Sequence, residues 1–379
     1  MRWPRHAVET VRPSRFSPPF CPRPSCIAHR SPGHGFIRNG WYRRKTDPKR
    51  IPRFCCRDCG KSCSKQTFST TYYLKRPELL VAVASGLTAC SAHRQIARSQ
   101  HCAKTSVTRM AERLGRHAIL FHARCRALLK SLDEVVVHDH FEAFIGRQDR
   151  CLGIGTAVGF QSWFVYDVDP APHRGSGRRS DRKPDPSAAS LPVKAYVRSI
   201  ERTFRGLIPH LSEGRSLTCN VDGRADYLAA AKANDVNPRV VLRIYPNPAR
   251  GPKGSPPTAE TRARDRALHP ADELHALIRH TCSDHKRETI AFGRRLESIM
   301  GRAHLIAVWK NFIKGRSERK PDRTTPAMKL GLTDTRWQWD RLLSRRLFAH
   351  REKISVVAGL IYRKRWTRSL PDLGLKRAA

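Results

Sequence analysis

Short apolar runs separated by turn residues characterise the stretch from Val135 to Asp169. The runs EVVVH, CLGIGTAVGF and SWFVYDVD have the length of strands and are rich in β-branched and aromatic residues. A helical pattern follows at about 192–206, then a strand (SLTCNVD), a helix (DYLAAAKAN) and another strand (RVVLRIY). From Pro270 to about Ile313 the pattern is helical again, and proline suits the first turn of a helix. The order β-β-β-α-β-α-β-α predicts an α/β domain.

This order of elements matches a ribonuclease-H-like core, which we expect to cover residues 132–315. Two basic, Pro-rich stretches, 170–190 and 246–268, are expected to interrupt it as loops. The rest of the chain divides into a Pro- and Arg-rich N-terminus expected to be disordered (1–20), a cysteine-rich part (21–75), a helical part (78–130) and a basic C-terminal segment (316–379).

The helical part carries the pattern of a helix-turn-helix. Ile96 and Ala97 would be buried in a first helix. A second helix has an apolar stripe at i, i+3, i+4 and i+7, formed by Val107, Met110, Ala111 and Leu114. Its opposite face carries side chains suited to phosphates and base edges, namely Lys104, Thr105, Ser106, Thr108 and Arg109. We therefore predict DNA reading by this helix; the alternative is an ordinary basic helical hairpin.

The charge of the chain points to a polyanionic partner. Lys and Arg number 73 against 32 Asp and Glu, a formal net charge of +41. Double-stranded DNA is the partner we expect, and an RNA-binding or ribosomal protein is the alternative at this stage. No apolar run is long enough to cross a membrane, and the N-terminal residues lack the apolar part of a secretory signal. We expect a location in a reducing bacterial cytoplasm, in association with the nucleoid.

Four of the 12 cysteines have the spacing of a structural zinc site. Cys21-x4-Cys26 and Cys56-x2-Cys59 are two close pairs, and four thiolates complete the tetrahedron that Zn²⁺ prefers. The segment has few residues that could build a core, so a metal would supply folding free energy. Two further thiols, Cys55 and Cys63, could be mistaken for ligands. Unmetallated buried thiols or a disulfide are the alternatives.

Two aspartates follow predicted strands and could share one edge of the sheet. Asp139 lies just after EVVVH, and Asp222 ends SLTCNV. With a third carboxylate they could hold two Mg²⁺ ions, which suits phosphodiester chemistry because one ion activates the nucleophile and the other stabilises the leaving oxygen. Each aspartate could instead be a turn residue: Asp139 at the end of its strand, and Asp222 in an Asp-Gly turn with Gly223.

The third carboxylate is expected on the helix that begins near Pro270. Glu273 is the first choice, because it shares a face with Ala276 and Leu277 and so borders the core. Glu288 shares a face with Phe292 and is the second choice, and Asp272 is the next. Acids at a helix start also simply complement the helix dipole.

Taken together, these segments resemble insertion-sequence transposases that have an N-terminal zinc ribbon. The resemblance is carried by scattered blocks between about residues 20 and 345: RFCCRDCGKSCSKQTFSTTYYLKRPELL, VHDHFEAF, LTCNVDGRADY, HKRETIAFGRRL and NFIKGRSERKPDRTTPAMKLGLTD. The first block looks like the family's ribbon, with Cys63 where an aromatic residue is usual. HKRETIAFGRRL looks like the helix near the third acid. More than one acid fits that helix, so the match departs from a clean triad.

The resemblance implies a DDE-type transposase that cuts the ends of its element and joins them to target DNA. Aspartates would hold Mg²⁺, and water or a 3′-hydroxyl would attack in line without a covalent protein–DNA intermediate. A homo-oligomer on DNA is expected. The rival functions are a regulator that binds DNA without catalysis, and a ribonuclease-H-like enzyme that processes RNA.

Overall fold

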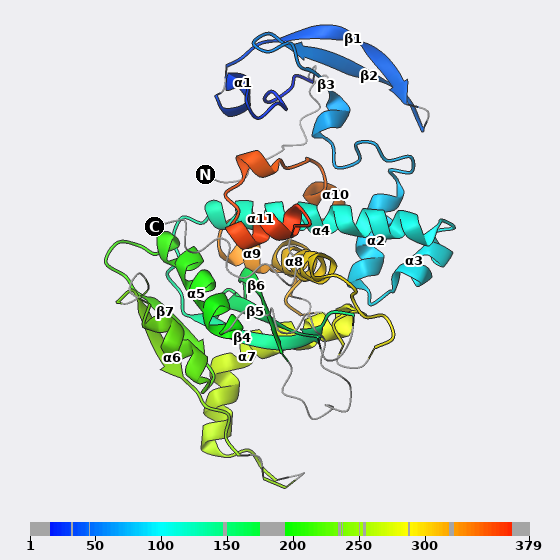
Figure 1. Ribbon diagram of the computed structural model, residues 1–379. Coiled ribbons are helices and arrows are strands. Elements are labelled where there is room, and N and C mark those ends of the chain that lie inside the picture. Colours follow the sequence, from blue (N-terminus) through cyan, green and yellow to red (C-terminus); the bar gives the residue numbers. More distant parts are fainter. Residues whose placement is uncertain are drawn as a thin grey trace.

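The computed structural model describes residues 16–365, with gaps at 32, 45, 147–149, 175–193, 234–235, 237, 250, 253–254, 287–288 and 318–321. These residues form a small N-terminal unit above a larger α/β body (Figure 1). The body has a mixed five-stranded sheet with helices on both faces, which confirms the predicted α/β class. No helix in the described part of the chain is long and apolar enough to cross a membrane.

The N-terminal unit consists of a short helix and a three-stranded antiparallel sheet. Helix α1 (Ile27–Arg30) is followed by β1 (Phe36–Arg44), β2 (Asp47–Cys56) and β3 (Ser62–Ser64), in the sheet order β1-β2-β3. The single-turn helix η1 (Lys65–Phe68) ends the unit.

An aromatic cluster joins this unit to the C-terminal part of the chain. Phe20 stacks edge-on against Phe68 and Phe348, with ring centroids 5.2 and 5.1 Å apart. Phe16 contacts Phe54 in the same way. Residues 16–20 were expected to be disordered, and this expectation is wrong because two aromatic rings fix them; residues 1–15 lie outside the described part.

Three helices follow, and the last is much longer than a helix-turn-helix requires. They are α2 (Leu79–Thr88), α3 (His93–Ser99) and α4 (Lys104–Ala127). Ile96, Ala97 and Val107 are buried as predicted. The predicted second helix is only the first part of α4, which continues into the body and packs against α8 (Leu296–Phe312).

The backbones of α4 and α8 are in close contact at two glycines. A Cβ placed on Gly115 would lie 2.9 Å from the Cα of Gly301. Real Cβ atoms are essentially never that close, so the absence of side chains at both positions lets the two backbones touch.

The large sheet has the order β6-β5-β4-β7-β8. Its strands are β4 (Val136–Phe144), β5 (Arg150–Gly159), β6 (Val165–Arg174), β7 (Leu217–Val221) and β8 (Val240–Ile244). Neighbours among β4, β5 and β6 are antiparallel, whereas β7 is parallel to β4 and to β8. Because β6 extends to Arg174, the first part of the predicted loop 170–190 is strand; residues 175–190 lie outside the described part.

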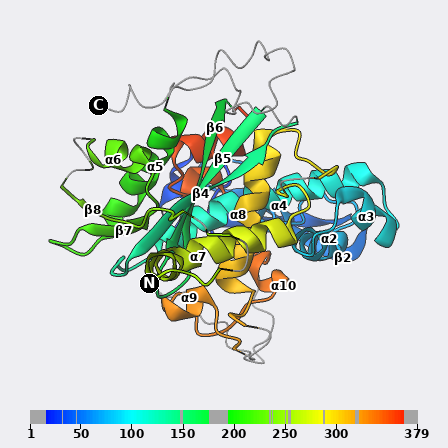
Figure 2. The same ribbon diagram turned by 90° about the horizontal axis from the view of Figure 1, so that it is seen from below.

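Helices cover both faces of this sheet. Helices α5 (Ala195–Leu207) and α6 (Ala225–Ala231) cover one face, and α7 (Ala259–Thr281) and α8 cover the other (Figure 2). Alternation along β4 directs Val137 and Phe141 toward α7, where they meet Leu268 and His275. His140, one residue on from Asp139, faces α5 and its Ser199.

The region after β8 differs from the sequence-based prediction. Helix α7 begins at Ala259, where the Thr258 hydroxyl caps it by accepting a hydrogen bond from the Thr261 amide. Part of the predicted loop 246–268 is therefore helix, and Pro270 lies inside α7. The single helix predicted from Pro270 to Ile313 is instead two helices, α7 and α8, separated by a loop.

The basic C-terminal segment is part of the body rather than an appendage. It contains α9 (Pro326–Lys329), α10 (Trp339–Leu342), the turn η4 (Ala349–Arg351) and α11 (Val356–Tyr362). Trp337 is buried against Phe121 of α4 and Phe312 of α8, with ring centroids 5.7 and 4.9 Å apart.

Candidate carboxylate site and cysteine cluster

Asp139 lies inside β4 and faces α7; the prediction that it follows the end of its strand is wrong, because β4 continues to Phe144. Its Oδ1 accepts a hydrogen bond from the His140 amide, 2.7 Å away, and its Oδ2 lies 3.6 Å from Nδ1 of His275. Burial raises the pKa of the Asp139 carboxyl to about 7, with the negative charge of Asp222, and more weakly that of Asp272, acting in the same direction. The negative charges of Asp222 and Asp272 therefore both act on the Asp139 carboxyl.

Asp222 follows the last residue of β7, the strand parallel to β4, and is buried. Its Oδ1 accepts a hydrogen bond from the Arg224 amide, 3.1 Å away, which fixes the carboxylate in a turn. Gly223 fits closely there, because a Cβ would lie 3.0 Å from Pro246 and would push that residue aside by a few tenths of an ångström. Asp222 is thus both a turn residue and a neighbour of Asp139.

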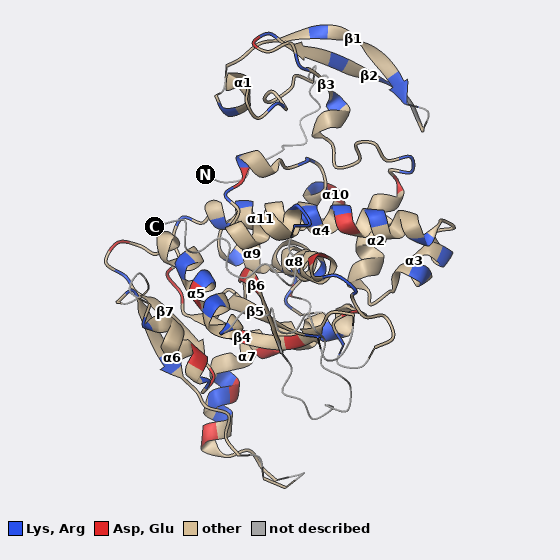
Figure 3. Cartoon of the chain, in the orientation of Figure 1, with Lys and Arg blue, Asp and Glu red and all other residues tan. Residues whose placement is uncertain are grey.

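Asp272 is the acid of α7 whose negative charge acts on Asp139. It lies three residues before His275, on the same side of the helix, and Nη1 of Arg264 donates to its Oδ2 at 2.5 Å. His275 is buried, its Nε2 is 2.8 Å from the Thr156 hydroxyl, and burial lowers its pKa to about 3. His275 is therefore neutral beside Asp139. Figure 3 shows the acidic residues gathered along α7.

Glu273 points elsewhere. Its Oε2 accepts a hydrogen bond from Nζ of Lys310 on α8, 2.7 Å away. The Leu277 and Ala276 side chains expected to share its buried face are half-buried and exposed. The buried face predicted for Glu273 is wrong, because the buried stripe of α7 runs through Leu268, Ala271, His275 and Ile278. Which acid completes the site stays a prediction, and the geometry favours Asp272. Glu288 lies outside the described residues.

Buried histidines behind Asp139 form a feature that the sequence analysis missed. His138 and His140 flank Asp139 and face α5 and α6, and burial lowers the pKa of both. The Tyr227 hydroxyl donates to the His138 carbonyl oxygen at 2.9 Å. These histidines hold β4 in place as neutral groups; their alternation with Asp139 in VHDHF was the available signal.

The four predicted cysteines come together in the N-terminal unit. Sγ of Cys21 lies 3.5 Å from Sγ of Cys59, and Sγ of Cys26 lies 3.9 Å from Sγ of Cys56. All four sulfur atoms lie within 4.8 Å of one another, so the cluster could hold a metal ion such as zinc. Burial alone would raise the pKa of Cys59, but hydrogen bonds from the Lys61 backbone and the other cysteines lower it to about 7.

The two additional thiols lie outside this cluster. Cys55 donates to the Gly60 carbonyl oxygen at 3.1 Å. Cys63 is buried between Phe54 and Phe68 and takes the packing position of an apolar residue.

The five side chains expected to read DNA lie near the start of α4, but they do not share one environment. Lys104, Thr105 and Arg109 are exposed, and Ser106 is half-buried. The Thr108 hydroxyl is 3.1 Å from Nδ1 of His93 and also donates to the Lys104 carbonyl oxygen. Thr108 therefore serves the contact between α3 and α4.

No protein-family model matches the chain, and no curated protein matches it either. Its function is therefore inferred from the arrangement of its own side chains.

Proposed function

We propose that the chain is a Mg²⁺-dependent DNA transposase with a ribonuclease-H-like core, preceded by a zinc ribbon and a helix-turn-helix. The sheet supports this proposal, because three antiparallel strands followed by two parallel strands, in the order β6-β5-β4-β7-β8, agree with such a core. The candidate carboxylates lie on its central strand β4, at the end of the adjacent strand β7, and on α7.

The observation that carries the proposal is the electrostatic coupling of Asp139 to Asp222 and Asp272. Burial is the main reason why the pKa of Asp139 reaches about 7, and the like charges of Asp222 and, more weakly, Asp272 raise it further. A bound cation would reverse this cost, because it stabilises the ionised carboxylates. Functional sites collect such perturbed groups more often than purely structural ones do.

Three groups in the described part of the chain have ligand atoms that all lie within 4.8 Å of one another, and the aspartate trio is not among them. The proposal therefore rests on the charges that act on Asp139 and on the placement of the three acids in the fold. When bound, two Mg²⁺ ions would activate the attacking oxygen and stabilise the leaving oxygen of the phosphodiester.

The protein's own residues would position these ligands. The His140 amide orients Asp139, and the Arg224 amide orients Asp222. Arg264 holds Asp272 and partly neutralises the cluster, and neutral His275 supports Asp139 without adding positive charge that would compete with metal. In this proposal Cys21, Cys26, Cys56 and Cys59 bind one structural Zn²⁺, and α3 with the start of α4 binds duplex DNA.

The experiment uses a duplex that carries the ends of the DNA segment encoding this chain. With Mg²⁺, the wild-type protein should nick that duplex, and Asp139→Asn, Asp222→Asn and Asp272→Asn should each reduce the rate at least about 100-fold while duplex binding persists. Asp265→Asn is the matched control, because Asp265 is an exposed acid of the same helix.

Each rival function gives a different result in this experiment. Binding of the ends by a wild-type protein that never nicks them would indicate a DNA-binding regulator. Cleavage of an RNA–DNA hybrid with the duplex left intact would indicate an RNA-processing enzyme. Cleavage by Asp139→Asn at the wild-type rate would overturn the carboxylate site itself.

A further inference from the structure

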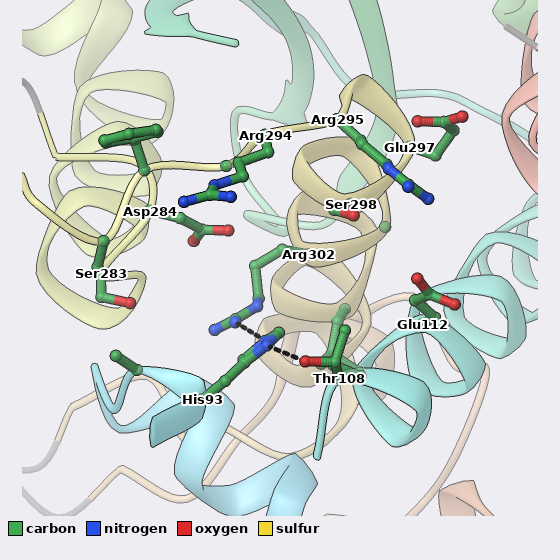
Figure 4. Close-up of a pocket in the computed structure, with 18 of the residues that line it drawn as sticks. His93, Thr108, Glu112, Ser283, Asp284, Arg294, Arg295, Glu297, Ser298 and Arg302 are labelled. Atoms are coloured by element: carbon green, nitrogen blue, oxygen red, sulfur yellow. Dashed lines mark hydrogen bonds between the residues drawn. The ribbon is translucent and has the colours of Figure 1, made fainter. Parts of the chain in front are cut away.

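A second feature lies beyond the carboxylates, where the loop between α7 and α8 faces the helix-turn-helix. A cavity of about 890 Å³ separates the two, lined on one side by α3 and α4 and on the other by the loop and the start of α8 (Figure 4). Part of this loop is HKRETIAFGRRL, which was expected to be a helix and is irregular as far as Arg295 in its described residues.

The lining of this cavity is strongly basic. Among its described residues, nine are Lys or Arg and three are Asp or Glu. Arg94, Arg98 and Lys104 come from the helix-turn-helix side, and Lys286, Arg294 and Arg295 come from the opposite side. Two of the three acids are already paired, Glu112 with Lys364 and Asp284 with His285. A polyanion would therefore find positive charge on both walls.

The floor of the cavity is a fixed network rather than a set of mobile side chains. Arg302 of α8 is buried, donates to the Leu87 carbonyl oxygen at 2.9 Å, and places Nη2 3.4 Å from Nε2 of His93. Burial, and then the charge of Arg302, lower the pKa of His93, so the neutral ring accepts from Arg302 and donates to the Thr108 hydroxyl. These hydrogen bonds link four helices, α2, α3, α4 and α8, below the opening (Figure 4).

One wall also presents apolar surface to solvent. Ile290 is 100% exposed, and the half-buried ring of Phe292 rests 6.0 Å from the ring of Phe144. Bases of a duplex are already stacked on each other and gain little from such a surface. Unpaired bases stack on aromatic and apolar side chains, while Lys and Arg side chains contact the phosphates of the nucleic-acid backbone. The walls of this cavity offer both kinds of side chain.

We propose that this cavity is a binding channel for a single DNA strand, with the cations of both walls on the phosphodiester backbone and Ile290 and Phe292 against the bases. A duplex, about 20 Å wide, would rest on the rim, whereas an unpaired strand can enter a volume of this size. Helix α7 leads from Asp272 to the edge of the channel, a rise of roughly 15 Å over ten residues. The channel would thus hold an unpaired strand near the carboxylates, and in this sense it rests on the proposed function.

The test measures the binding of fluorescent oligothymidylate of 12 nucleotides to the full chain without Mg²⁺, at several salt concentrations. Arg294→Gln/Arg295→Gln should weaken binding at least about tenfold and flatten the dependence of log K on log salt by about 1.4, since each single-strand phosphate contact contributes about 0.7. Arg323→Gln/Arg336→Gln is the matched control: both arginines are exposed, neither lines the cavity, and the charge change is equal.

A second pair of variants tests the apolar wall. Ile290→Asp should weaken binding several-fold, and Val356→Asp, at another exposed aliphatic residue outside the cavity, should not. Losses equal to those of the controls would overturn the proposal. A larger loss on duplex than on single-stranded DNA would do the same, as would binding of thymidine monophosphate as tight as that of the 12-mer. Because these experiments measure binding and not cleavage, they can support the channel in a protein that does not cleave DNA. They can also reject the channel in a protein that does cleave DNA.

Discussion

Lys310 on α8 donates to Glu273 on α7, with Nζ and Oε2 2.7 Å apart, and this pair removes Glu273 from the carboxylate cluster. Lys310 is only 5% exposed, and its ammonium also lies 5.3 Å from the centre of the Trp163 ring. The pair therefore gives adjacent residues of one helix two different roles. Glu273 neutralises a buried lysine, whereas Asp272 is paired with Arg264 and its charge acts on Asp139.

Substitutions at these two positions should separate the roles. Asp272→Asn should abolish Mg²⁺-dependent cleavage with little change in stability. Glu273→Gln should keep cleavage within a few-fold but lower the free energy of unfolding by about 1–3 kcal/mol, because Lys310 then loses its charged partner. Cleavage assays and denaturant unfolding measure the two effects. Loss of cleavage in Glu273→Gln or Glu288→Gln, with Asp272→Asn active, would restore the original ranking of the acids.

The stability of the metal-free protein should depend on Asp139. Its carboxyl pKa is about 7 in the folded chain against about 3.9 in an unfolded one, so the folded state binds an extra proton between these values. Stability should therefore fall as pH rises from about 4 to about 7. Asp139→Asn should reduce this fall and raise the Tm at pH 8.

Magnesium provides the control for that measurement. The ion should raise the Tm of the wild-type protein at pH 8 but not that of Asp139→Asn, because the variant lacks a ligand. Metal affinity should itself increase up to about pH 7, as protons stop competing for Asp139. An Asp139→Asn protein that is less stable than wild type at pH 8 without Mg²⁺ would contradict the repulsion of the carboxylates.

Removal of a predicted zinc ligand should unfold the N-terminal unit. Cys59→Ser should lose about one zinc per chain by elemental analysis and expose β1–β3 to proteolysis, since the metal supplies folding free energy there. Cys55→Ser is the matched control: its hydroxyl can still donate to Gly60, and zinc content should not change. Full zinc in Cys59→Ser would remove that residue from the ligand set.

The contact between Gly115 and Gly301 should tolerate no side chain. Gly115→Ala forces α4 and α8 apart and should cost about 1–3 kcal/mol of unfolding free energy. Gly206→Ala in α5 is the control, because the added Cβ has its nearest neighbour at 3.5 Å and alanine favours the helix. Equal stability of the two variants in thermal unfolding would argue against a close crossing.

The exposed start of α4 should contribute to duplex binding. Arg109→Ala should weaken binding to the ends of the encoding DNA and reduce the salt slope by about 1, as expected for one lost phosphate contact. Thr108→Ala should act differently, through the His93 contact, and lower stability. Unchanged affinity and salt slope for Arg109→Ala would show that this face does not touch DNA.

Local patterns were sufficient to predict the strands and the cysteine cluster. β4, β7 and β8 are short apolar runs between turn residues, and the four cysteines lie in two close pairs. The buried face of α7 was predicted wrongly, because Glu273 was grouped with Ala276 and Leu277 and the helix was taken to begin at Pro270. The buried stripe runs from Leu268 to Ile278 and leaves Asp272 beside it, which the packing of α7 on the sheet decides. The apposition of Ile290 and Arg94 across a cavity has no local signal, because it depends on how distant helices pack.

Because α4 runs unbroken from its contact with α3 into the body, the proposed function would make it a rigid spacer between the DNA sequence that is bound and the bond that is cut. Its 24 residues span roughly 36 Å, which corresponds to about ten base pairs of duplex. The contact of Gly115 with Gly301 lies near the middle of α4 and fixes the helix against α8. Insertions between a recognised terminal sequence and its cleavage point should therefore be poorly tolerated, and changes of sequence within that interval should matter much less.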